Sequence, residues 1–172
     1  MKQNRNQVPQ AGNLLLSEPF LQDDNFSRSV ILLCEHGEAT GSVGFVLNKP
    51  SILNLGDLIS ELDFLDVDVF VGGPVEQNTL HFIYFGVQQL EESKSLGNGI
   101  WWGGDFPTLI QLLNSGKVLL DEVRFFIGYS GWSPGQLVTE LLEPSWIVSS
   151  GSLTQELLKK SPDQLWRALM KS

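Results

Sequence analysis

The stretch at residues 123–142, VRFFIGYSGWSPGQLVTELL, limits most strongly what this chain can fold into. Its first half carries apolar residues at alternate positions, which predicts a strand. Gly128, and the glycine three positions later, interrupt the run where a side chain would resist positive φ or close backbone contact. Ser133 is then placed to cap a helix, with Pro134 at its first position and Gln136 able to bond back to the cap. The stretch predicts a strand, a tight turn and a helix in that order.

The remaining sequence alternates short strands with short helices. The run at residues 28–35 contains five consecutive apolar residues, which indicates a strand buried on both faces. Residues 91–99 are polar and are predicted to form a loop. The other predicted strands cover residues 12–17, 42–47, 67–71, 80–85, 100–102 and 146–148, and further helices are predicted after Asn54, after Asp105, near Leu157 and after Ser161. Because the order lacks a regular strand–helix alternation, we expect an α+β fold with a mixed, mostly antiparallel and strongly curved sheet.

Length and charge restrict the classes of protein to which the chain can belong. Its 172 residues suit one domain, which we place at residues 12–172 after a polar, flexible stretch at residues 1–11. The net charge of −9 disfavours nucleic acids and anionic membranes, because such partners are bound mainly through Lys and Arg. No apolar run reaches the length of a membrane helix, and the N-terminus lacks a signal core. We therefore expect a cytoplasmic protein without a membrane partner.

Several ordered motifs resemble those of one bacterial family. They are residues 12–19 (GNLLLSEP), 23–30, 35–36, 44–50 (GFVLNKP), 72–75 (GGPV), 128–137 (GYSGWSPGQL), 140–141 and Trp146. As an ordered set, these motifs resemble the AlgH-like family, also called YqgE, whose members have no established activity. The resemblance implies sheets folded into a pseudo-barrel with peripheral helices. The family name suggests a role in regulating alginate synthesis, whereas the acidic charge argues against direct DNA binding.

The glycine turn at residues 131–136 has two interpretations. As the approach to a helix N-terminus, it could bind a phosphate or carboxylate near Ser130, Ser133 and Gln136. However, it matches neither of the common phosphate-binding loop patterns, and Ser133 and Gln136 are already explained as cap and partner. Tight packing of the turn is therefore the plainer interpretation. The sequence around Ser130 is also one residue short of a GxSxG nucleophile elbow.

Charged and imidazole side chains give weaker signals. His36 and His81 lack a third ligand with metal-site spacing, so no metal and no cofactor are predicted. Arg28, with Asp23 and Asp24, could hold a substrate carboxylate or simply fix a turn. Asn48, before Lys49-Pro50, is interpreted as a turn residue. Arg124 lies within the central strand and would need a carboxylate partner if its side chain pointed inward; an edge-facing side chain is the plainer alternative.

Aromatic residues suggest a different kind of function. If Trp101, Trp102 or Trp132 lies exposed beside a glycine turn, it could anchor a protein partner, and surrounding acidic charge would favour a basic one. If the tryptophans are all buried, they only pack the core. Cys34 falls in a buried apolar run and is not expected to react. The candidate binding residues are therefore Arg28, His36, Asn48, Tyr129, Ser130, Trp132 and Gln136.

Three functional hypotheses follow from these features. The first is a non-enzymatic protein that binds another protein, in keeping with the absence of a complete catalytic set. The second is a small-anion binder or an enzyme that uses the turn from Gly131 to Gln136. The third is a transcriptional regulator, which the net charge disfavours. The sequence leaves the oligomeric state open.

Overall fold

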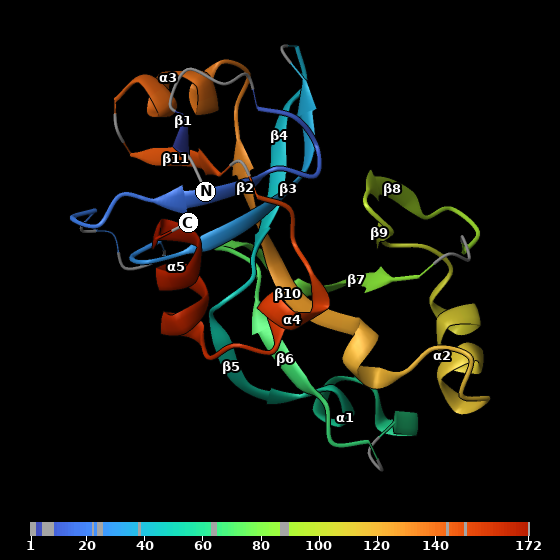
Figure 1. The fold of residues 1–172 in the computed structure, drawn as a ribbon. Helices are drawn as coiled ribbons and strands as arrows, with labels where there is room; N and C mark the ends of the chain where they lie inside the picture. Colours follow the sequence, from blue (N-terminus) through green and yellow to red (C-terminus); the bar gives the residue numbers. More distant parts are fainter. Residues whose placement is uncertain are drawn as a thin grey trace.

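Strand β10, Val123–Trp132, joins two halves of one sheet in the computed structural model (Figure 1). Its first half lies between β6 (Asp68–Val71), which is parallel to it, and β7 (Val75–Phe85), which is antiparallel. Its last three residues pair instead with β4 (Gly41–Val46). The register shifts between Ile127 and Tyr129, where Gly128 has φ +69°. The predicted central strand is thus present, and its glycine marks the change of partner.

The structure describes residues 3–4, 9–21, 23, 26–37, 39–62, 65–86, 90–143, 145–149 and 151–171. One sequence prediction falls outside these ranges, namely the role of Asp24 in a charged turn. The predicted flexible stretch at residues 1–11 also lies largely outside them. Within it, β1 (Gln3–Asn4) pairs with β11 (Trp146–Ser149).

The sheet contains eleven strands among the described residues and does not close on itself. Starting from β1 and β11, the order continues through β2 (Leu14–Ser17), β3 (Val30–Gly37), β4, β10, β7, β9 (Ile100–Trp102) and β8 (Lys94–Gly97). On the other side of the first half of β10, β6 pairs with β5 (Pro50–Asn54). Only the β6–β10 pair is parallel among these strands. The predicted α+β class with a mixed, mostly antiparallel sheet is confirmed.

The helices cover different parts of the sheet. Helix α3 (Gln136–Leu142) packs on one face of the β1–β4 half, whereas α4 (Gln155–Leu158) and α5 (Pro162–Lys171) pack against the other. Helices α1 (Leu55–Leu58) and α2 (Phe106–Asn114) cover the other half of the sheet, at the end of the molecule away from α3 (Figure 1). Short 3-10 helices span Ser60–Leu62 and Leu120–Glu122. In the part of the chain described, no helix has both the length and the apolar character needed to cross a membrane.

Strand β3 confirms the prediction of a strand buried on both faces. Val30, Leu32 and Cys34 belong to the core beneath α5, and Ile31 and Leu33 belong to the core beneath α3. Burial raises the pKa of the Cys34 thiol, which keeps it protonated.

Helix α3 begins later than predicted. Gly135 has φ +83°, a left-handed conformation that cannot belong to a right-handed helix, so the helix begins at Gln136. The predicted contact back from Gln136 is nevertheless present, because the Ser133 amide donates a hydrogen bond to Gln136 Oε1 at 2.9 Å. It closes a turn before the helix.

Two strand predictions are also corrected. The predicted loop at residues 91–99 contains strand β8. Its residues are mostly polar and only Leu96 is buried, so the sequence lacks the apolar alternation of a strand. Strand β7 begins at Val75, five residues earlier than predicted, because its first half is mostly exposed and polar.

We predict that Gly72→Ala destabilises the protein by about 1–3 kcal/mol, the usual cost of forcing extra atoms into a packed core. A Cβ atom at Gly72 would lie 2.5 Å from the Gly128 carbonyl oxygen and 2.7 Å from Phe45 Cδ1. The matched control is Gly131→Ala, whose Cβ would meet nothing closer than 3.5 Å. Urea denaturation of both variants measures the difference, and equal free energies of unfolding would contradict the prediction.

Candidate functional site

The seven candidate residues do not converge on one site. Asn48 and Arg28 lie together, because Asn48 Nδ2 donates to the carbonyl oxygens of Arg28 and Pro162, each at 3.0 Å. Asn48 Oδ1 accepts from the Val30 amide at 2.9 Å. The Arg28 side chain pairs with Asp163 at 3.2 Å and lies over the Trp166 ring. These contacts attach the start of α5 to the sheet.

Tyr129, Ser130 and His36 lie elsewhere and bond to neighbouring strands and turns. Ser130 is buried and donates its hydroxyl hydrogen to the Gly72 carbonyl at 3.0 Å. Tyr129 donates to the Glu76 carboxylate at 2.8 Å, and this bond raises the pKa of Tyr129. His36 Nδ1 lies 2.6 Å from Ser42 Oγ. These contacts bind each side chain to its own part of the sheet.

The other histidine is bound locally as well. His81 Nε2 lies 2.8 Å from Thr79 Oγ1, and partial burial lowers the pKa of His81. Among the residues described, no group of three or more His, Cys, Asp or Glu side chains could hold a metal ion.

Trp132 and Gln136 are the candidate residues that share a polar partner, Glu140 on α3. One carboxylate oxygen, Oε1, accepts the indole N–H of Trp132 at 3.2 Å and that of Trp146 at 2.9 Å. The other, Oε2, accepts from Gln136 Nε2 at 2.8 Å. Trp132 and Trp146 are almost completely buried, so Glu140 accepts hydrogen bonds from two donors that are largely shielded from water.

A hollow of about 360 Å³ opens beside this network, and we call it the tryptophan hollow. Its aromatic walls are Phe26, Trp132 and Trp146, which stack edge to face. Its ionisable residues are acidic throughout: Asp23, Glu140 and Glu143. Leu21, Gly131, Gln136 and Ser145 complete the lining.

This geometry favours a cation over an anion at the turn from Gly131 to Gln136. The backbone amide of Ser133 already donates to the side-chain oxygen of Gln136, and the side-chain amide of Gln136 donates to Glu140. The carboxylates around the hollow would repel a phosphate or carboxylate.

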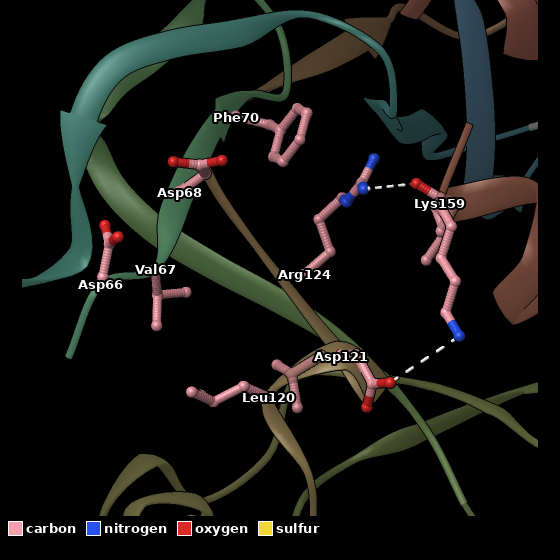
Figure 2. Close-up of a pocket in the computed structure, with 10 residues that line it drawn as sticks. Asp66, Val67, Asp68, Phe70, Leu120, Asp121, Arg124 and Lys159 are labelled. Atoms are coloured by element: carbon pink, nitrogen blue, oxygen red, sulfur yellow. Dashed lines mark hydrogen bonds and ion pairs between the residues drawn. The ribbon is translucent and has the colours of Figure 1, made fainter. Parts of the chain in front are cut away.

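A second hollow of about 300 Å³ lies at the start of β10, and we call it the arginine hollow (Figure 2). Arg124 projects into it between Phe70 and the chain at Lys159. Its guanidinium lies 3.9 Å from the Phe70 ring centroid and donates to the carbonyls of Leu47 and Leu158, each at 2.8 Å. The conditional prediction that an inward Arg124 needs a carboxylate is therefore wrong, because two carbonyls and a ring take that place.

Sequence reasoning did not place Arg124 in a hollow. The residues that meet it come from β6, from the position just after β4 and from α4, and no local pattern links these segments. The one available signal was a single charge within an apolar strand.

Comparison with known proteins assigns the chain to a family. The family model described as AlgH-like matches residues 14–172. The chain belongs to the AlgH-like family. A relative called a UPF0301 protein, from Cytophaga hutchinsonii, is 39% identical over 162 residues, which are 94% of this chain and 88% of that protein. Another UPF0301 protein, from Chlorobaculum parvum, is 37% identical over 169 residues, covering 98% and 89% of the two chains. The family resemblance in the sequence is confirmed.

Solved structures share the fold of this AlgH-like chain. The solution structure of the AlgH protein from Pseudomonas aeruginosa matches with a TM-score of 0.71 and 25% identity, covering 98% of this chain and 89% of that one. A crystal structure of a protein from Corynebacterium diphtheriae matches with a TM-score of 0.78 over 99% and 89% of the two chains. Because the two sequences are 24% identical, this match shows a shared fold and nothing further.

We predict that Glu140→Ala lowers the free energy of unfolding by about 2 kcal/mol, because it leaves two buried indole donors unsatisfied. The control is Glu143→Ala, three positions further along. Glu143 is exposed and, among the described residues, no side chain pairs with it, so this change should cost less than about 0.5 kcal/mol. Urea unfolding followed by tryptophan fluorescence measures both; similar losses for the two variants would contradict the assigned role of Glu140.

Proposed function

We propose that this AlgH-like protein is a non-enzymatic, cytoplasmic binding protein that docks a basic side chain of a protein partner in the tryptophan hollow. The proposal assigns it a regulatory rather than a catalytic role. The observation that carries it is the lining of the hollow, where aromatic walls meet ionisable groups that are all acidic. Aromatic faces and carboxylates together suit a lysine or arginine side chain, through cation–π and charge attraction.

Exposed apolar residues support a protein partner over a small cation. Phe20 is 90% exposed and precedes Leu21, which lines the hollow. Leu142 is 73% exposed and precedes Glu143, another lining residue. Large apolar side chains exposed beside a charged hollow provide the apolar contacts that a basic side chain alone does not.

We expect agmatine, a small guanidinium compound, to bind in the tryptophan hollow and shift the NMR signals of the Trp132 and Trp146 indole N–H groups. Glu143→Gln should weaken agmatine binding about fivefold, which corresponds to about 1 kcal/mol for one lost charge pair. The matched control is Glu156→Gln, which makes the same charge change at an exposed position of α4. Equal weakening by both variants would reduce the effect to net charge and contradict the site.

The protein partner is tested separately with a photo-crosslinking residue in place of Leu142. A second variant carries the same residue in place of Leu58, which is also exposed but belongs to α1 at the other end of the molecule. We expect a discrete crosslinked protein in native lysate from position 142 alone, and Glu143→Gln should reduce it. Crosslinks of equal yield from both positions would contradict docking at this hollow.

A further inference from the structure

Arg124 is an enclosed cation whose hydrogen bonds account for only part of its capacity. A guanidinium has five N–H donors, and two of them bond to the carbonyls of Leu47 and Leu158. Within the described ranges, no carboxylate forms an ion pair with Arg124. Burial lowers the pKa of Arg124 to about 10, and nearby Asp68 acts in the opposite direction, so the group stays protonated at neutral pH. It therefore presents a positive charge with unused donors.

A smaller hollow of about 180 Å³ lies next to the arginine hollow and shares Arg124, Phe70 and Asp68 with it. Its second cation is Lys160, and Asn48, Pro50, Pro162 and Leu165 complete its lining. No carboxylate of the described residues pairs with Lys160. In an acidic protein, this hollow is a local site where cations outnumber acids.

The arginine hollow has the opposite balance. It adds Asp66 and Asp121 to the shared Asp68, and its Lys159 pairs with Asp121 at 3.8 Å. Asp66 accepts a hydrogen bond from Asn54 at 2.7 Å. Figure 2 shows Asp66 and Asp68 on one side of Arg124, and Lys159 on the other. A ligand that spans the two hollows therefore meets cations at one end and carboxylates at the other.

We propose that the two hollows together bind a small zwitterion of the amino-acid class. Its carboxylate contacts Arg124 and Lys160, and its ammonium group faces Asp68. A simple anion suits the site less well, because Asp68 would repel it and would gain no partner. An apolar side chain can lie against Phe70.

The size of the site agrees with this class of ligand. Ligand pockets usually begin at about 300 Å³, which the arginine hollow alone reaches, and the adjoining hollow of about 180 Å³ adds to it. The site is separate from the tryptophan hollow, because Arg124 and Trp132 lie eight residues apart on β10, roughly 25 Å along an extended strand. The two proposals can therefore fail independently.

The test compares three probes by NMR titration of the full chain: L-norvaline, valerate and n-butylamine. Norvaline has both charged groups, whereas each of the other two has one. We expect norvaline to bind at least about fivefold more tightly than either analogue, because each retained charge pair contributes about 1 kcal/mol. The perturbed signals should belong to residues around Arg124, Phe70 and Asp68.

Substitutions at two exposed positions test which charged side chains contact the ligand. They leave Arg124 unchanged, because its loss could unfold the protein. Lys160→Gln should weaken norvaline and valerate, and its control is Lys117→Gln, an exposed lysine after α2. Asp68→Asn should weaken norvaline and remove its advantage over valerate; the control is Glu92→Gln in an exposed turn.

Several outcomes would overturn the proposal. One is the absence of perturbation around Arg124 at about 20 mM norvaline, which corresponds to a binding free energy too small for a site. Another is equal or tighter binding of valerate, which would indicate a plain anion site. A third is the same weakening by Lys117→Gln as by Lys160→Gln, which would reduce the effect to overall charge.

Discussion

The close backbone contact between Gly72 and Gly128 is the constraint on which the rest of the structure depends. The Gly72 amide donates to the Ile127 carbonyl at 2.9 Å, and the Gly72 carbonyl accepts from the Val46 amide at 2.8 Å. A single residue thus holds β4 and β10 together where β10 changes partner. A side chain at either glycine would meet a carbonyl oxygen of the opposing segment. The contact therefore allows one strand to serve both halves of the sheet, which separate hairpins could not do.

Strand β10 places the tryptophan hollow at its end and the arginine hollow at its start. At its end, Trp132 reaches α3 through Glu140, and the carboxylate that satisfies two buried indoles also gives the tryptophan hollow part of its negative charge. At its start, Arg124 reaches Leu47, the residue after β4, and Leu158 of α4 through their carbonyls. In both places a charged side chain has a structural role and still contributes to a hollow. The same residues that stabilise the fold thus determine which charge each hollow attracts.

Much of the fold could be predicted from the sequence, but few of the contacts that form the tryptophan hollow and the arginine hollow could be. The apolar run of β3 and the alternation in β10 reflect burial directly, so periodicity found both strands. Strand β8 was not predicted because only one of its side chains, Leu96, is buried. The start of α3 was misplaced because Gly135 adopts a left-handed conformation that no local sequence pattern indicates. Trp132 and Gln136 were identified as candidates from their position at a turn. Their shared partner Glu140, and the carbonyls around Arg124, depend on long-range contacts that a local pattern does not record.

The hydrogen bonds from Arg124 to two backbone carbonyls have a consequence for the order in which the chain folds. They join residue 124 to residue 47, far earlier in the chain, and to residue 158, near its far end. During synthesis, β4 and β10 leave the ribosome before α4 does, so the guanidinium remains solvated until the last segments arrive. The arginine hollow therefore cannot be complete before residues 158 and 159 have been synthesised, and any molecule held there would strengthen the attachment of the C-terminal helices to the sheet.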